Sequence, residues 1–247
     1  MSATVTAPES ISPSLRSAAR MDAAYELKFV VAEPVAAAIQ DWSAQHLAPD
    51  PHGDPGLAGA YRTVSLYFDT PEFDVYHRTR GYWRRKYRVR RYGEGGVVFL
   101  ERKTRDGNRV SKRRSQLPLT ELAQLQEAAG TTEWSGAWFQ RRLARRRLQP
   151  ACVVGYERSA YFGACSEGPL RLTLDRELHG APARDWTTLA ARPALPLLLD
   201  GVVLELKFAT SLPQPFKELV ARFGLATAAV SKYRLCREAW GLPAGSA

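Results

Sequence analysis

Short stretches of strand character run along most of the chain. The segment Tyr25–Val31 (YELKFVV) alternates apolar and charged residues, and this period of two is typical of a strand with two unlike faces. Further strands are predicted at Tyr61–Phe68, Tyr82–Tyr92, Val97–Thr104, Arg109–Gln116, Cys152–Phe162, Leu170–Leu178 and Val202–Phe208. GEGG from Gly93 and the pair Asp106-Gly107 indicate hairpin turns, and another turn is expected around Gly168.

Helices are predicted between these strands and after the last one. One begins near Pro34, which suits the first turn of a helix, and runs to about Leu47. The segment DTPEF from Asp69 is expected to form a short capped helix with Pro71 at its start. Helical periodicity predicts others at Leu119–Ala129, Trp134–Leu148, Phe216–Phe223 and Ser231–Trp240.

Strands dominate this order of elements, and the helices come singly or in pairs between hairpins. The pattern favours an α+β fold built on an antiparallel sheet or barrel, with the helices packed outside it. One domain is expected over residues 23–241, between a disordered N-terminal tail at 1–22 and a C-terminal tail at 242–247. No apolar run approaches the roughly 20 residues that span a bilayer. The protein is therefore expected to be soluble, and its three cysteines without CxxC spacing favour a location in the reducing cytoplasm.

The composition favours an acidic partner and argues against two kinds of site. Among 247 residues, 35 Lys and Arg stand against 25 Asp and Glu, which gives a formal net charge of +10. Such a surplus fits a phosphate ligand, although many proteins carry one only for solubility. The three cysteines show no CxxC spacing, which argues against a disulfide framework and a structural zinc site and fits a reducing compartment.

Several predicted strands carry charged residues two or four positions apart, and hence on one face. The pairs are Glu26 and Lys28, Arg88 and Arg90, Glu101 and Lys103, Arg171 and Asp175, and Glu205 and Lys207. A one-sided sheet with its charged face in water would show the same period, but such a face usually includes Thr, Ser and Gln as well. If about eight strands close into a barrel with these charges inside, the side chains line a tunnel for one slender ligand.

A polyanion would match such a tunnel, because burying many like charges is costly unless an opposite charge enters. Arginine binds phosphate oxygens bidentately and lysine acts as a mobile point charge, so their mixture suits a row of phosphates. The few carboxylates would then hold Mg²⁺ or Mn²⁺, which typically takes one or two carboxylates and completes its shell with phosphate oxygens and water.

Eight short segments also occur in the order of a known family. They are ELK from Glu26, SLYFDT from Ser65, RVR from Arg88, ERK from Glu101, YERSAY from Tyr156, RLTLD from Arg171, LELK from Leu204 and SKY from Ser231. From about Tyr25 to Cys236 the chain thus resembles the VTC domain, the polyphosphate polymerase branch of the CYTH-like triphosphate tunnel metalloenzymes. The resemblance implies a closed tunnel barrel that binds ATP by its phosphates and passes the γ-phosphoryl group to a growing polyphosphate chain, with Mn²⁺ or Mg²⁺.

The resemblance also implies roles for individual residues. The phosphate clamp would comprise Arg88, Arg90, Lys103, Arg158 and Arg171. Further bases that bind the nucleoside triphosphate or polyphosphate would be Lys28, Lys112, Lys207 and Lys232, with Arg113 or Arg114 as alternatives to Lys112. Glu205 would be the metal carboxylate, with Glu26, Glu101 and Asp175 as further ligands or their supports. A specific nucleic-acid partner is not expected.

The chain departs from the family pattern in two respects. Arg91 stands where an aromatic residue is expected after the RxR motif. Eukaryotic members carry an inositol-phosphate-sensing domain and membrane helices, and neither fits in this chain, so regulation by that sensor and membrane translocation are not implied. Two alternatives to the polymerase stay open: a triphosphatase acting on tripolyphosphate or a nucleotide, and a non-catalytic binder of polyphosphate or nucleic acid.

The run RRLARRR from Arg141 lies on a predicted helix. It could bind nucleic acid or an emerging product, but charge runs commonly serve only to solvate a helix face, and this interpretation is favoured. Trp134 and Trp138 on the same helix are interpreted as core side chains rather than stacking platforms. The GEGG segment lacks the Lys-Ser or Lys-Thr of a phosphate-binding P-loop and is interpreted as a plain hairpin.

Overall fold

The computed structural model describes residues 23–107, 109–127, 133–186, 189 and 195–241. The two predicted tails, 1–22 and 242–247, lie outside these ranges. Within them, no helix is long and apolar enough to cross a membrane.

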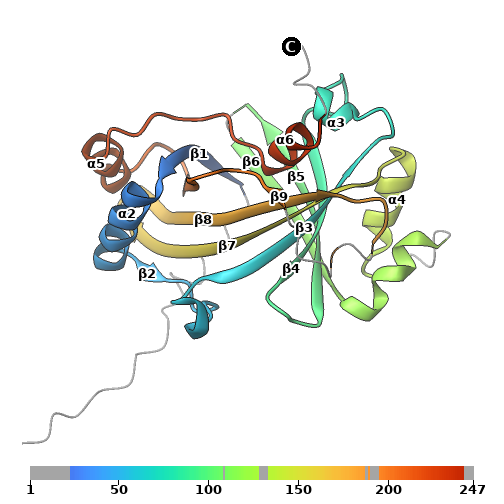
Figure 1. Cartoon of the computed structure of the whole chain (residues 1–247), viewed down its shortest axis with the longest axis horizontal. Coiled ribbons are helices and arrows are strands. Elements are labelled where there is room, and N and C mark those ends of the chain that lie inside the picture. The colour runs from blue at the N-terminus through green and yellow to red at the C-terminus, as the bar shows by residue number, and fades with distance from the viewer. Residues whose placement is uncertain (1–22, 108, 128–132, 187–188, 190–194, 242–247) are drawn as a thin grey trace, which may run out of the picture.

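Eight antiparallel strands close into a ring, which confirms the predicted barrel (Figure 1). Their order around the ring is β7-β3-β4-β5-β6-β1-β10-β8, and β8 pairs again with β7. The strands are β1 (Ala23–Ala32), β3 (Tyr61–Asp69), β4 (Arg85–Tyr92), β5 (Val97–Asp106), β6 (Arg109–Pro118), β7 (Gln149–Cys165), β8 (Gly168–Pro182) and β10 (Gly201–Phe208). Two short strands lie outside the ring: β2 (Ala48–Pro49) pairs with β7, and β9 (Leu195–Pro196) pairs with β8.

Strand β1 pairs over very different lengths with its two neighbours in the ring. This strand pairs with β10 from Tyr25 to Ala32, but its pairing with β6 covers only Ala23–Tyr25. Because β1 leaves β6 after Tyr25, the side chain of Glu26 reaches Lys103 on β5, the strand beyond β6.

The hydrophobic core lies between the barrel wall and the helices, and not inside the barrel. Leu66, Val89 and Leu100 are fully buried on the outer face of β3, β4 and β5, whereas their neighbours Arg88 and Glu101 face inward. The helical elements are α2 (Glu33–His46), η1 (Pro55–Leu57), α3 (Asp74–His77), η2 (Leu119–Gln126), α4 (Ala137–Arg145), α5 (Gln214–Arg222) and α6 (Lys232–Ala239). In Figure 1, α2 and α5 lie at one side of the barrel and α4 at the other. The predicted outer helical layer is thus confirmed.

Several predicted boundaries were wrong for local reasons. Strand β4 begins at Arg85 and not at Tyr82, because Gly81 has φ +90° and Arg85 N–H bonds back to the Tyr82 carbonyl in a turn. The short helix begins at Asp74 and not at Pro71, because Phe73 has φ +59°, which a right-handed helix does not include.

The two helices predicted before β7 are shorter than expected. The one predicted at 119–129 is the 3₁₀ helix η2, which ends at Gln126, and residues 128 and 129 lie outside the described part of the chain. The one predicted at 134–148 is α4, which begins after Gly136 and ends at Arg145. Trp134 and Trp138 pack against the core as predicted.

Candidate active site

The inward face of the barrel carries charged side chains that meet across strands that are not neighbours. Lys103 Nζ on β5 lies 2.8 Å from Glu26 Oε2 on β1, although β6 separates these strands in the sheet. The Arg90 guanidinium on β4 lies 5.8 Å from the Tyr156 ring centre on β7, across β3. Such contacts require both side chains to point into the ring. The charged faces predicted from the sequence therefore face the interior.

Glu26 and Glu205 share the ammonium group of Lys28. Lys28 Nζ lies 3.0 Å from Glu26 Oε1 and 2.5 Å from Glu205 Oε1, and Lys207 Nζ lies 3.5 Å from Glu205 Oε2. Burial opposes ionisation of both carboxyls, and for Glu26 so does the charge of Glu205, but the nearby bases, Lys28 first among them, outweigh these effects. The pKa of Glu26 falls to about 2 and that of Glu205 well below its ordinary value. Both acids are thus carboxylates that face one cation.

Glu101 forms a second group with three bases. Its carboxylate is fully buried and lies 2.6 Å from Arg88 Nη2, 3.3 Å from Lys112 Nζ and 3.1 Å from Arg114 Nε. Burial lowers the pKa of Lys112 to about 8 in spite of the nearby carboxylate. Of the three residues considered for this position, the structure brings Lys112 and Arg114 into the interior, whereas Arg113 lies on the outer face of β6.

Asp175 forms a third group with Arg158 and Lys232. Arg158 binds the carboxylate bidentately, with Nε–Oδ1 and Nη2–Oδ2 distances of 2.5 and 2.7 Å. Lys232 Nζ lies 2.5 Å from Oδ2 and comes from the first turn of α6, which Ser231 caps. Burial opposes ionisation of Asp175, but the two bases outweigh it and lower its pKa to about 2.

Three interior bases lack a close carboxylate among the described residues. Arg90 donates from Nε to Ser65 Oγ at 2.9 Å, and Arg171 lies no nearer than 4.0 Å to Asp50. Lys86 donates to Ser231 Oγ at 2.7 Å; burial, and then the charge of nearby lysines, lowers its pKa to about 7. The interior therefore holds more positive than negative charge.

Lys86 is a residue that the sequence reasoning missed. It precedes Arg88 and Arg90 on the same face of β4, so the period of two was present in the sequence and had only to be extended by one step.

Polar atoms without partners also lie on the inward faces. Thr63 Oγ1, Tyr156 Oη and Thr173 Oγ1 are buried and have no hydrogen-bond partner in the part of the chain that the structure describes, and the same holds for Arg171 Nε. Buried polar groups normally have a partner, so this set indicates a site that binds water or a polar ligand. Tyr156 additionally places its ring against Arg90, Arg158 and Lys232.

The donor set fits a divalent cation at one place. No group of three or more His, Cys, Asp or Glu that could hold a metal is found in the described part of the chain. The pair Glu26 and Glu205 supplies two carboxylates around a single cationic position, which suits Mg²⁺ or Mn²⁺ when phosphate oxygens and water complete the shell. Glu101 and Asp175 lie in their own groups of bases. The four predicted acids are thus not gathered in one place.

The departure at Arg91 lies away from this interior. Its Nε and Nη2 donate to the carbonyls of Gly95 and Glu94, at 2.9 and 2.8 Å. Arg91 therefore stabilises the hairpin turn between β4 and β5 and does not alter the charged face.

A closed antiparallel barrel with basic side chains and a few carboxylates inside is the architecture of the triphosphate tunnel proteins, a class that handles phosphoryl groups. The family model of the VTC domain matches residues 23–240, and the chain belongs to this family.

Two solved structures illustrate the likeness. A candidate adenylate cyclase from Bacillus halodurans has a TM-score of 0.53 at 13% identity, over 85% of this chain and 96% of that chain, and shows the shared fold. A candidate adenylyl cyclase from Hippeastrum, described as having a dominant triphosphatase activity, has a TM-score of 0.49 at 14% identity, over 91% of this chain and 99% of that chain. No curated protein matches the chain.

Proposed function

We propose that the protein is a metal-dependent polyphosphate polymerase, which transfers the γ-phosphoryl group of ATP to a growing polyphosphate chain inside the barrel. The observation that supports this most is the excess of interior bases over interior acids: among the described residues, no carboxylate pairs with Arg90 or Lys86, and Arg171 lies 4.0 Å from Asp50. A linear polyanion would neutralise this excess along its length. Membership of the VTC family favours polyphosphate as the product.

The bases converge from strands that are two places apart in the ring. Arg90 on β4 and Arg158 on β7 approach the same Tyr156 ring, at 5.8 and 5.3 Å from its centre. A phosphate chain between them would meet guanidinium groups from two sides, and Arg88, Lys103 and Arg171 would extend this clamp. Phosphoryl transfer depends mainly on such positioning and charge neutralisation, so no nucleophilic side chain is needed. The attacking atom would be an oxygen of the terminal phosphate of the bound chain.

Glu26 and Glu205 are the residues that would hold Mn²⁺ or Mg²⁺. A cation bound there would neutralise charge on phosphate oxygens as transfer proceeds. Lys28 bridges the two carboxylates in the structure, so it competes for them with the cation. Lys207 and Lys103 balance the same pair and would turn toward phosphate once it is bound.

Labelled ATP tests the proposal and separates transfer from hydrolysis. The purified protein is incubated with Mn²⁺ and ATP labelled at either the α or the γ phosphate, and products are resolved on a gel. The γ label is expected in long chains and the α label is not. An Arg88→Ala/Arg90→Ala variant should form no chains while keeping its fold, because Glu101 retains Lys112 and Arg114. Release of γ label only as free phosphate would replace the polymerase with a triphosphatase.

A matched control guards against a general effect of charge. Lys217 and Arg222 are exposed on α5, far from the interior groups. A Lys217→Gln/Arg222→Gln variant removes the same charge as the Arg88 and Arg90 substitutions and should form chains at the normal rate. Equal loss of activity in both variants would argue that surface charge, and not the barrel interior, drives catalysis.

A further inference from the structure

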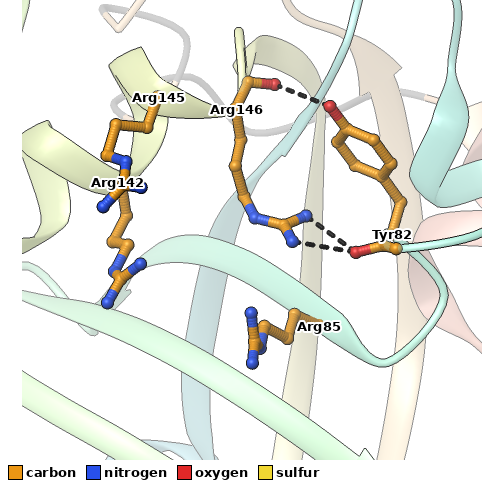
Figure 2. Close-up of a pocket in the computed structure, with 6 residues that line it drawn as sticks. Tyr82, Arg85, Arg142, Arg145 and Arg146 are labelled. Atoms are coloured by element: carbon orange, nitrogen blue, oxygen red, sulfur yellow. Dashed lines mark hydrogen bonds between the residues drawn. The ribbon is translucent and has the colours of Figure 1, made fainter.

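A second basic site lies outside the barrel, between α4 and the outer face of β4 and β6. Helix α4 buries Phe139 and Leu143 against the core, which leaves its arginines on the other side. A hollow of about 380 Å³ is lined by Gly81, Tyr82, Arg85, Arg142, Arg145 and Arg146. Figure 2 shows the arginines of α4 and Arg85 of β4 around this space. An adjoining hollow of about 200 Å³ is lined by Arg113, Trp138, Arg141, Arg142 and Arg145.

The interpretation of RRLARRR as a solvated helix face fits the exposed Arg141, Arg145 and Arg147, but two further arginines of the run are less exposed. Arg142 and Arg146 are half-buried, and Arg146 donates two hydrogen bonds of 2.9 Å to the Gly81 carbonyl across the hollow. The periodicity of the run could not show this, because the opposing residues come from the turn before β4 and from β6. The arginines therefore gather at one place between three elements.

The gathered arginines lack opposing charge. Arg85, Arg141, Arg142 and Arg145 form no ion pair with any residue that the structure describes. Arg102 lies in register between Tyr87 on β4 and Arg113 on β6, and its Nε is buried without a hydrogen-bond partner among the residues that the structure describes. Like charges held together at this density favour an anion that binds them all.

The aromatic rings at the site indicate which anion. The Arg146 guanidinium lies 4.8 Å from the Tyr82 ring centre, and that of Arg113 lies 4.3 Å from the Trp138 ring centre. The rings are thus already stacked by the protein's own side chains, whereas a single-stranded nucleic acid relies on free rings for its bases. The groups that remain available to a ligand are guanidinium groups, which bind phosphate oxygens bidentately. The larger hollow falls within the usual range of ligand sites.

The site lies close to the barrel interior. Arg85 is the first residue of β4 and lines the outer hollow, while the next residue, Lys86, faces inward and contacts Ser231. One strand thus separates the two basic sites at this end of the barrel. A chain that leaves the interior here would meet the outer arginines next.

We propose that this α4 arginine site, formed by Arg85, Arg113, Arg141, Arg142, Arg145 and Arg146, binds a condensed phosphate chain outside the barrel. Its role as a guide for the product rests on the proposed function, but its affinity for inorganic polyphosphate does not. The site takes consecutive phosphates of a long chain, whereas short triphosphates are bound by the interior.

The binding test uses long-chain inorganic polyphosphate and tripolyphosphate at fixed salt, with calorimetry as the readout. An Arg142→Gln/Arg145→Gln variant should bind long chains about tenfold more weakly and tripolyphosphate with unchanged affinity. The Lys217→Gln/Arg222→Gln variant carries the same charge change and should bind long chains within about twofold of the unchanged protein. An Arg142→Lys/Arg145→Lys variant keeps the charge but loses the bidentate geometry of the guanidinium groups. Its affinity for long chains should lie between those of the other two variants.

Two results would overturn the inference. One is an equal effect of the α4 and α5 variants on long-chain binding, which would reduce it to general charge. The other is single-stranded DNA displacing polyphosphate at equal phosphate concentration. The Arg88→Ala/Arg90→Ala background separates this inference from the proposed function: long-chain binding there should still depend on Arg142 and Arg145, whether or not the protein makes polyphosphate.

Discussion

Arg90 on β4 and Arg158 on β7 both lie against the Tyr156 ring, yet their surroundings differ. Arg158 is bound bidentately by Asp175, so its charge is compensated within the protein. Arg90 is only 4% exposed, and its side chain donates a hydrogen bond to Ser65 and to no carboxylate within the described ranges. A buried charge without an opposite charge is costly unless a ligand supplies it. Arg90 is thus placed for binding rather than for stability.

Substituting each arginine with Met tests this difference. Arg158→Met leaves Asp175 with Lys232 alone and should lower the free energy of unfolding by about 3 kcal/mol. Arg90→Met should change it by no more than about 1 kcal/mol, while turnover falls about 100-fold or more because a phosphate contact is lost. Urea unfolding and the labelled-ATP assay measure the two effects. Equal destabilisation by both substitutions would contradict this account.

Lys86 gives the interior a dependence on pH. Burial and neighbouring lysines lower its pKa to about 7, and the pKa values of Lys103 and Lys112 fall to about 8. A bound polyanion favours the charged amine and raises these pKa values. Tripolyphosphate should therefore bind with proton uptake near pH 8, and its affinity should fall as the pH rises through about 7 to 8.

Calorimetry in buffers of different ionisation enthalpy measures this uptake. The ligand titrates as well, so the informative quantity is the difference between the unchanged protein and Lys86→Met, in which uptake should be smaller. Without ligand, the stability of the fold depends on pH in the opposite direction. The Lys86 amine keeps its proton to higher pH in the unfolded chain than in the folded one, so its contribution to stability grows from about pH 7 toward 10. Identical uptake in both proteins would remove Lys86 from the site.

At the scale of elements, one buried carboxylate joins β3, α3 and α6. Asp69 ends β3 and accepts the N–H groups of Val75 and Tyr76 at 2.8 and 2.9 Å, which satisfies the first turn of α3. It also accepts the hydroxyl of Tyr233 on α6. Because α6 carries Ser231 and Lys232 into the interior, Asp69 indirectly holds two site residues in place.

Substitutions of Asp69 and of Tyr233 should lower the free energy of unfolding by different amounts. Asp69→Ala leaves three backbone donors, those of Thr70, Val75 and Tyr76, and one hydroxyl without their acceptor, and should lower the free energy of unfolding by about 3 kcal/mol or more. Tyr233→Phe removes a single hydrogen bond and should cost about 1 kcal/mol. Thermal unfolding of both variants measures the difference. A Tyr233→Phe cost as large as that of Asp69→Ala would contradict this view of the junction.

The elements that the sequence predicted well are those with long, regular periods. The alternation in β1 and β10 needed no tertiary information, because each strand has one apolar and one charged face. Boundaries set by single backbone conformations were missed, as at Phe73 and Gly81. Strands β2 and β9 have two residues each, too few for any period to show.

The sequence predicted which face of each strand carries the site residues, but not which of these residues contact one another. Alternation indicated that Glu26, Glu205 and Lys103 would be inward once the barrel closed. Their contacts depend on the register between neighbouring strands and on the point, after Tyr25, where β1 leaves β6. Neither feature can be read from the alternation of residues. The α4 arginines show the same limit, since their surroundings come from elements distant in the chain.

At the scale of the whole molecule, the barrel reverses the usual distribution of polarity. Its wall is covered on the outside by apolar layers under the helices, and its inside holds charges that are only partly balanced. The helices thus stabilise a ring whose centre contributes little hydrophobic burial. The interior can therefore carry charged side chains that suit a ligand, because the outer hydrophobic core offsets the free energy that their burial costs.

The most direct test is a crystal structure with a non-hydrolysable ATP analogue and Mn²⁺. The account predicts the triphosphate inside the ring, in contact with Arg88 and Arg90 of β4 and with Arg158 of β7, and an anomalous manganese peak at Glu26 and Glu205. A triphosphate bound only on the outer surface, with the interior ion pairs unchanged, would contradict it.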